Sequence, residues 1–342
     1  MRLGLLAIAL LACACSSAPH TESGWQTLVA LQTKAKLGGC VVADLIADEP
    51  GDEIAVVAST GTVFMVRRVG SDWMTELVCE MPGEMIQIAA GDLDPRIPGD
   101  ELVFVGAKTG GEDDGGPGVA VYAWRQDDRW HHERILEDSK LLHGVAVGDF
   151  DPEHPGVEAM VAGYTHKAHV LGVGEGGWRK LAEVDVGAEA KGVAAGLGGA
   201  VVANADGSLV MVISHRSAWQ SRVIGRYPAP LARLTADANE VIFCSNDGTL
   251  RRYASGETTE LYSSSDRLRG AVVVDIDHTT AGVEIATAGY TGEVTVLAAG
   301  KARVVAWDDN KFHHLAAGEL AGLGTCLVGC GYSGRVLVVR RR

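Results

Sequence analysis

The sequence predicts an all-β protein, a seven-bladed β-propeller whose last blade is closed by an N-terminal strand. One strand pattern recurs along nearly the whole chain, in seven copies that begin near residues 38, 86, 143, 191, 231, 269 and 313. The intervals between the copies run from 38 to 57 residues, which is the length of a four-stranded propeller blade. The last copy stops one strand short, and a matching strand stands ahead of the first copy.

Each copy has the same order of parts: strand, acidic turn, strand, glycine-containing hairpin and strand. The third copy shows it clearly, with a first strand at 143–148 and a second at 157–163, whereas the copies at 191 and 231 are weaker. The third strands are β-branched and poor in helix formers. A fourth strand follows and often begins at a tryptophan, such as Trp73 or Trp130.

The seventh copy lacks this fourth strand, because the chain stops at Arg342 after the third one. Residues 24–31 contain a strand led by Trp25 that fits the missing position. We therefore expect residues 24–31 to pair against 335–340 and complete blade seven. Closure of this kind removes the exposed sheet edges that an open array of blades would carry.

The acidic turns and the strands after them resemble a known repeat. Residues 148–151, followed by 156–163, resemble the repeat of FG-GAP/VCBS-type propellers, and the resemblance covers nearly the whole chain after the N-terminal segment. It implies the propeller fold and a possible calcium cofactor. The implied calcium ligands are Asp92, Asp94, Asp149, Asp151, Asp275 and Asp277.

These turns depart from the calcium pattern, because two of them carry two prolines each and a displaced glycine, and the third lacks its third carboxylate. Calcium needs six to eight oxygen ligands, and the loops offer few of them in order. The alternative is that the aspartates cap tight turns through hydrogen bonds to their own backbone.

The N-terminal segment reads as an export signal. Arg2 is followed by a short apolar run that cannot span a bilayer as a helix, and the run ends at Leu10-Leu11-Ala12-Cys13. This tetrapeptide resembles a bacterial lipobox, which implies a signal peptide at 1–12, lipidation of Cys13, a tether at 13–23 and a propeller at 24–342. The alternative is an ordinary secretory signal that is cut near Ala18. With the lipid anchor, we expect an outer-membrane lipoprotein that faces the periplasm or the cell surface.

Composition restricts the partners. The formal net charge of −14 argues against nucleic acid, because phosphate binding needs a basic face.

The cysteines beyond the signal region show no paired spacing and lie among apolar residues, which favours buried, unpaired thiols. We expect a monomer.

The propeller geometry gathers a different set of residues at one mouth of the central channel. The first position of each copy should ring this mouth, at Gly38, Ile86, His143, Lys191, Leu231, Arg269 and His313. The hairpins should bring Tyr164, His166, Tyr290, Tyr332 and Lys108 beside them. An acidic protein would thus collect His, Arg, Lys and Tyr on one face, with the acidic turns on the other.

Two functions fit this arrangement. The first is a membrane-anchored propeller that binds a carbohydrate-like or anionic ligand, or a protein partner, at the mouth. The second is a polysaccharide lyase or sugar dehydratase, in which Tyr or His removes a proton and Arg or Lys holds the developing enolate. Its candidate catalytic residues are the pairs His143 with Tyr164 and His313 with Tyr332, with Arg269 as the anion clamp. Lys191, His166, Tyr290 and Lys108 are candidate ligand-binding residues.

Overall fold

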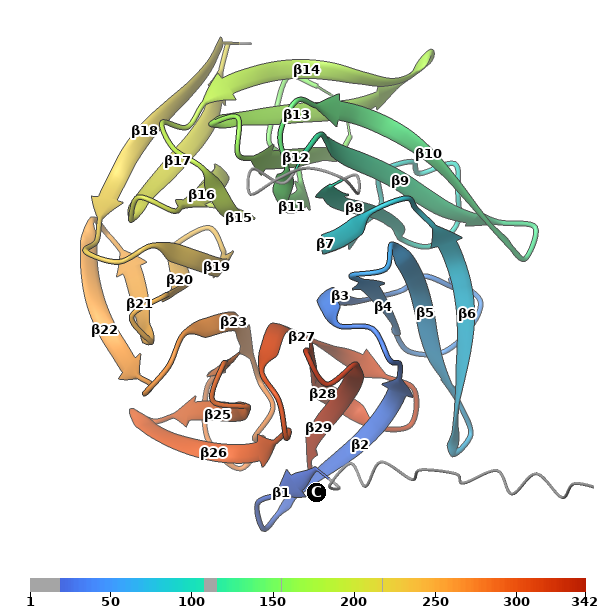
Figure 1. The fold of residues 1–342 in the computed structure, drawn as a ribbon, viewed down its shortest axis with the longest axis vertical. Helices are drawn as coiled ribbons and strands as arrows, with labels where there is room; N and C mark the ends of the chain where they lie inside the picture. The colour runs from blue at the N-terminus through green and yellow to red at the C-terminus, as the bar shows by residue number, and fades with distance from the viewer. Residues whose placement is uncertain (1–18, 108–115, 155, 217) are drawn as a thin grey trace, which may run out of the picture.

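Seven antiparallel sheets form a closed ring around a central axis in the computed structural model (Figure 1). The structure describes residues 19–107, 116–154, 156–216 and 218–342. None of these residues lies in a helix long and apolar enough to cross a bilayer. The predicted all-β, seven-bladed propeller is therefore confirmed for the part of the chain that the structure describes.

Each blade has four strands from the axis outward. The inner strands are β3 (Leu37–Ala43), β7 (Glu84–Gly91), β11 (Leu142–Gly148), β15 (Ala190–Gly196), β19 (Leu231–Ala236), β23 (Leu268–Val274) and β27 (Phe312–Leu320). The second strands are β4 (Glu53–Ala58), β8 (Glu101–Ala107), β12 (Glu158–Gly163), β16 (Gly199–Asn204), β20 (Glu240–Ser245), β24 (Glu284–Gly289) and β28 (Gly324–Gly331).

The third strands are β5 (Thr62–Val69), β9 (Gly118–Gln126), β13 (Lys167–Gly174), β17 (Ser208–His215), β21 (Thr249–Ala254), β25 (Glu293–Ala298) and β29 (Arg335–Arg341). The outer strands are β6 (Asp72–Glu80), β10 (Arg129–Asp138), β14 (Gly177–Asp185), β18 (Ala218–Arg226), β22 (Glu257–Ser263), β26 (Lys301–Trp307) and β2 (Trp25–Gln32). Every residue of β4, β12 and β16 is buried, whereas the outer strands expose many of theirs.

The inner strands approach their neighbours so closely that glycine is required. A Cβ atom on Gly38 would lie 2.7 Å from the carbonyl oxygen of Met85 in the next blade, and one on Gly192 would lie 2.6 Å from that of Ala232. Gly270 is equally confined by the backbone of Leu315. Glycine has no Cβ, so it allows this backbone contact around the axis.

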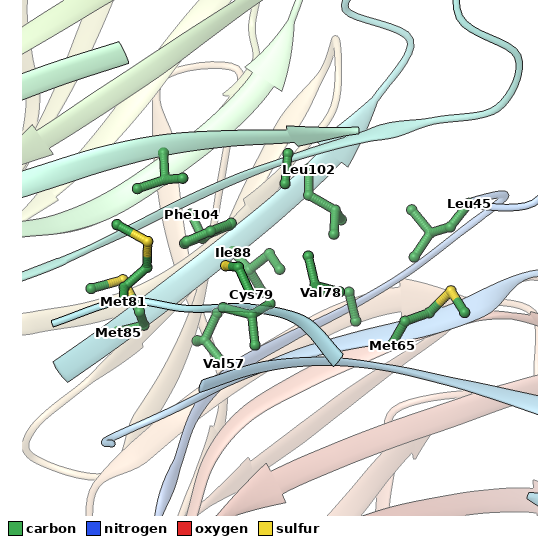
Figure 2. Packing of buried hydrophobic residues seen from close by; sticks show 14 of the residues in the cluster. Leu45, Val57, Met65, Val78, Cys79, Met81, Met85, Ile88, Leu102 and Phe104 are labelled. Carbon is green, nitrogen blue, oxygen red and sulfur yellow. The ribbon is translucent and has the colours of Figure 1, made fainter. Parts of the chain in front are cut away.

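Hydrophobic side chains fill the spaces between neighbouring blades. Figure 2 shows the cluster between the first two blades, in which Val57 and Met65 of one sheet meet Met85, Leu102 and Phe104 of the next. Because each blade buries its faces against its neighbours, closing the ring also covers the facing sides of the first and last blades.

Closure runs through the N-terminal strand, as predicted. Strand β2 pairs antiparallel with β29, with Trp25 opposite Arg341 and Gln32 opposite Arg335 (Figure 1). Part of the segment that we expect to be a tether joins the propeller. His20 and Thr21 form β1, which adds a fifth strand to blade six by pairing with β26.

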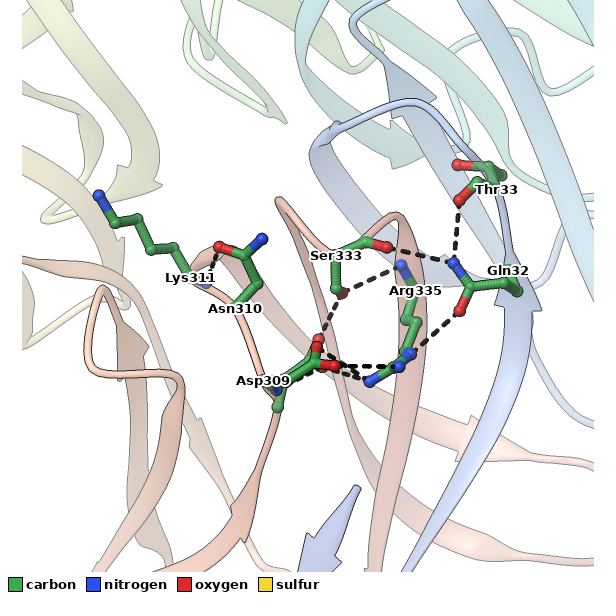
Figure 3. A network of polar contacts seen from close by, with 8 residues as sticks. Gln32, Thr33, Asp309, Asn310, Lys311, Ser333 and Arg335 are labelled. Carbon is green, nitrogen blue, oxygen red and sulfur yellow. Dashed lines mark hydrogen bonds and ion pairs between the residues drawn. The ribbon is translucent and has the colours of Figure 1, made fainter. Parts of the chain in front are cut away.

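A buried polar network reinforces this closure (Figure 3). Arg335 donates from Nη1 to Asp308 at 2.7 Å and from Nε to the side-chain oxygen of Gln32 at 3.0 Å. It also donates to Asp309, and Gln32 donates to the carbonyl oxygen of Ser333 at 3.1 Å. The network ties β2, β29 and the turn before β27 together, with Arg335 and Asp308 buried and Gln32 exposed at its edge.

We expect Arg335→Met to lower the free energy of unfolding by about 3 kcal/mol, because it leaves the carboxylate of Asp308 buried without its partner. The two side chains are only 4% and 2% exposed. Equilibrium unfolding in urea measures the loss. The control is Lys180→Met, which breaks the exposed pair with Glu183 and should change the same quantity by less than about 1 kcal/mol. Equal losses in the two variants would contradict the role given to Arg335.

Candidate functional site

A β-bulge near the start of each inner strand turns one side chain of that strand out of the ladder. In β11 the pairing passes from Leu142 to Gly144, so His143 has no partner in β12. The same shift leaves Lys191, Arg269 and His313 unpaired in their strands. Bulges re-aim side chains and are frequent beside functional sites. Here they direct the first positions of the repeat to the mouth.

These residues line one cavity of about 270 Å³ at the mouth of the channel. Its lining consists of His143, Tyr164, Lys191, Leu231, Ala232, Arg233, Asn246, Arg269, Tyr290 and His313. Lys191, Arg233 and Arg269 are cationic, and none of these described lining residues is acidic. An overall acidic protein thus presents a local concentration of positive charge.

Arg233 reaches across the channel from blade five. Its Nη1 donates to the side-chain oxygen of Gln87 in blade two at 2.5 Å, and to the carbonyl oxygens of His143 and Lys191 at 3.1 and 3.0 Å. The residue is 3% exposed, and its Nη2 has no hydrogen-bond partner. Burial, together with the positive charge of Arg269, lowers the pKa of Arg233 to about 10, so it stays charged at neutral pH.

Sequence reasoning missed Arg233, although a signal for it was present. In the copies of blades one, three, four and six the residue after the bulge position is glycine, as in Gly144 and Gly192. Blade five has Arg233 at this place and blade two has Gln87. At this place the long side chain of Arg233 extends across the axial channel to Gln87.

Two neutral histidines add hydrogen-bond acceptors to the cavity. The Nδ1 of His143 lies 3.0 Å from the carbonyl oxygen of Lys191, and the Nδ1 of His313 lies 2.6 Å from that of Gly38. A carbonyl accepts only, so the contact of His313 places the proton on Nδ1 and a lone pair on Nε2. The carbonyl contact of His143 favours the same tautomer, and it is shorter than the 3.4 Å between Nδ1 and the Nη1 donor of Arg233. Burial and the charge of Arg233 lower the pKa of His313 to about 4 and that of His143 well below 6.5.

Of the three predicted tyrosines, one contacts a lysine and the other two contact each other. Tyr164 receives a hydrogen bond from Lys191, whose Nζ also lies 3.7 Å from the centre of the Tyr164 ring. Tyr290 lines the cavity, and its hydroxyl is 3.3 Å from the hydroxyl of Tyr332 behind it. The proposed pairs make ring contacts without hydrogen bonds, with centroids 6.0 Å apart for His143 and Tyr164 and 5.8 Å for His313 and Tyr332. Neither pair is therefore arranged for direct proton transfer within itself.

Other predicted residues do not line this cavity or lie outside the residues that the structure describes. His166 is exposed in a turn, at a φ of 63°, and does not line the cavity, contrary to its expected place beside the mouth. Lys108 and Cys13 lie outside the described residues. The described cysteines, from Cys40 to Cys330, are all buried and unpaired, as their apolar surroundings indicated.

The acidic turns on the opposite face are held by glutamates. Glu158 accepts hydrogen bonds from the backbone amides of Phe150 and Asp151 at 2.8 and 3.2 Å. Glu101 does the same for Leu93 and Asp94. Glu53 and Glu284 cap the corresponding turns of blades one and six.

The proposed calcium ligands are used locally instead. Asp94, Asp151 and Asp277 each accept a hydrogen bond from the amide two residues later, at 3.2, 3.2 and 3.3 Å, while Asp275 contacts His278. Asp92 and Asp149 are exposed. No group of three or more His, Cys, Asp or Glu side chains within the described ranges could hold a metal ion. The geometry follows the alternative of self-capped turns, and it gives calcium no support.

Comparison with known proteins gives the architecture alone. No family model matches the sequence, and no curated protein matches it. A solved structure described as the WD40 β-propeller domain of Doa1 is similar, with a TM-score of 0.67 and 12% sequence identity, over 93% of this chain and 97% of that chain. This chain resembles a WD40 propeller. At this identity the likeness establishes the fold alone, and the similarity to FG-GAP/VCBS repeats stays a resemblance.

The buried glutamates should make stability depend on pH. Burial raises the pKa of Glu53 and Glu101 from 4.5 to about 7, against the lowering effect of their amide hydrogen bonds. The folded protein therefore holds these protons more tightly than the unfolded chain, and the free energy of unfolding should fall as pH rises from about 4.5 to about 7. In Glu101→Gln this decline should be smaller, which urea unfolding at a series of pH values measures.

The control for this prediction is Glu183→Gln, which removes an exposed glutamate whose pKa a hydrogen bond from Lys180 lowers. It should keep the decline of the unmodified protein. A Glu101→Gln curve parallel to that of the unmodified protein would show that Glu101 is ionised throughout.

Proposed function

We propose that this protein binds a small polyhydroxylated anion, such as a sugar acid, in the cavity at its channel mouth. The observation that carries the proposal is the buried guanidinium of Arg233, which makes no ion pair with any carboxylate among the described residues. A buried charge without a counter-ion is costly to folding. An anionic ligand in the adjoining cavity would supply the missing counter-charge.

Arg269 and Lys191 add to the attraction for an anion. Arg269 donates to the side-chain oxygen of Asn246 at 2.5 Å, which fixes the guanidinium at the cavity wall. Lys191 is partly neutralised by Glu189 at 3.3 Å. Arg269 is therefore the cation best placed to contact a ligand directly, while Arg233 contributes its charge from below.

The two histidines favour hydroxyl groups on the ligand. No described residue donates to the Nε2 of His143 or His313, so each offers a lone pair to a ligand hydroxyl. The cavity volume of about 270 Å³ lies near the lower end of the range for small-molecule pockets, about 300 Å³. It suits one sugar-sized molecule better than a polysaccharide chain.

We also propose that the propeller is held outside the cytoplasm by a lipid on Cys13. The support is the sequence at the N-terminus, Leu10-Leu11-Ala12-Cys13, which resembles a lipobox. The binding site would then meet ligands in the periplasm or at the cell surface.

Ligand binding is tested by calorimetric titration with D-glucuronate and with D-glucose, which has a similar set of hydroxyls but no carboxylate. Glucuronate should bind at least about tenfold more tightly, because a charge-assisted hydrogen bond contributes about 1.5–3 kcal/mol. Arg269→Gln should lose this preference. Arg129→Gln removes an exposed arginine from strand β10 and should retain it. Equal affinity for the two sugars, or no binding of either, would overturn the proposal.

The lipid anchor is tested by expression in a bacterial host with radiolabelled palmitate. The full chain should incorporate label and sediment with membranes, whereas Cys13→Ser should do neither. Cys15→Ser is the matched control and should behave as the unmodified chain. Label that persists in Cys13→Ser would rule out Cys13 as the acceptor.

A further inference from the structure

Tyr290 occupies an unusual electrostatic position in the cavity wall. The Nζ of Lys311 lies 4.7 Å from the centre of its ring, the Cζ of Arg269 lies 4.9 Å away, and the Cζ of Arg267 lies 5.9 Å away. The phenol is half-buried, and it lines the cavity on the same wall as Arg269. Three cations from two blades therefore lie within 6 Å of the ring of one ionisable phenol.

These surroundings favour the ionised form of Tyr290. Burial alone would raise the pKa of this phenol, but hydrogen bonds from Tyr332 and Arg269 and the charges of Arg269 and Arg267 together hold the pKa below 10. The pKa of Tyr332 moves the other way, to about 12, because of its burial and its contact with Tyr290. In this pair Tyr332 is thus the hydrogen-bond donor and Tyr290 the acceptor. Lys36 and Glu84 are charged groups near Tyr332 rather than Tyr290.

We propose that Tyr290 is a catalytic base in this cavity, and that the protein eliminates water from a small hydroxy acid. This inference rests on the proposed anion-binding function. The substrate class is an acid with a hydrogen on the carbon next to its carboxylate and a hydroxyl on the following carbon, as in hexonates and hexuronates.

The reaction balances without a further reactant. The phenolate of Tyr290 takes the proton next to the carboxylate, and the electrons of that C–H bond form a carbon–carbon double bond as the neighbouring C–O bond breaks. Tyr290 then gives the same proton to the departing hydroxyl, which leaves as water. The first products are an unsaturated acid and water, and Tyr290 returns to its starting state. From a hexonate this acid is an enol, which tautomerises to the 2-keto-3-deoxy acid, whereas a hexuronate gives a stable unsaturated acid.

Neighbouring residues have separate roles in this step. Arg269, with Arg233 below it, stabilises the negative charge that builds on the carboxylate as the proton leaves. Tyr332 is a positioning residue, since its hydroxyl lies 3.3 Å from that of Tyr290 and it does not line the cavity.

The first experiment follows tyrosinate absorbance in the near ultraviolet during a pH titration of the folded protein. The unmodified protein should show one tyrosine that ionises below the others. This phase should be absent in Tyr290→Phe, move to higher pH in Tyr332→Phe and persist in Tyr262→Phe, which changes a tyrosine of outer strand β22. A Tyr290→Phe curve that retains the early phase would overturn the assignment of the base.

The second experiment incubates the protein in deuterated water with D-gluconate and with D-galacturonate, followed by proton NMR. The unmodified protein should exchange the proton next to the carboxylate or release an unsaturated acid, and Tyr290→Phe should lower that rate at least about a hundredfold, within the range for loss of a general base. Calorimetry should show that Tyr290→Phe still binds glucuronate.

The two proposals fail in different ways. Binding of the acids with neither exchange nor product in the unmodified protein would overturn the elimination and leave the binding function intact. Reaction at an equal rate in Tyr290→Phe would overturn the role of Tyr290. Absence of binding by any of the acids would overturn the anion-binding function itself, on which the elimination depends.

Discussion

The pairing of β2 with β29 is the constraint on which the rest of the molecule depends. Only with Gln32 fixed opposite Arg335 does blade seven have its outer strand, and only then do blades seven and one pack against each other. The contact joins residues about three hundred positions apart in the chain, so the entropy of closing the ring must be met by many contacts formed together. The hydrogen bond from Arg335 to Gln32 joins β29 to β2 at this closure, and the cavity at the mouth lies within the closed ring.

The same repeat that builds the ring also builds the site. A bulge that only relieves crowding in one inner strand becomes, when repeated around an axis, a set of side chains aimed at one point. Hydrophobic or glycine residues at this position, such as Ile86 and Gly38, leave part of the mouth neutral, whereas Lys191, Arg269 and the two histidines make the remainder polar. The residues at the mouth therefore differ between blades at a few positions, whereas the positions that pack one blade against the next follow the repeat.

Much of this was accessible from the sequence. The repeat spacing, the missing last strand and the strand led by Trp25 were enough to predict the ring and its closure. The number of strands and the need to cover a sheet edge can both be read from the order of apolar and turn residues. The ring positions His143, Lys191, Arg269 and His313 also line the cavity as predicted. Arg233 was missed because it stands two residues beyond the start of its copy, where the bulge leaves both Ala232 and Arg233 without a partner in β20. His166 was misplaced because a hairpin turn at positive φ directs its side chain to solvent, which periodicity does not encode. Hydrogen-bond partners, such as Lys191 for Tyr164, depend on contacts between blades that no local pattern reveals.

The distribution of charge explains how an acidic propeller can hold an anion. Glutamates such as Glu158 and Glu101 accept hydrogen bonds from backbone amides in the turns of one face, and none of the described residues that line the cavity is acidic. At the mouth the balance is reversed, with Arg233 sealed beneath the cavity and Arg269 at its wall. Replacing such an unpaired buried charge by an apolar side chain of similar volume is often neutral or stabilising in proteins. A guanidinium in this position lowers the stability of the protein without a ligand. A ligand of opposite charge would make the same guanidinium favourable. In the proposed function, binding of an anion would offset the stability given up at Arg233.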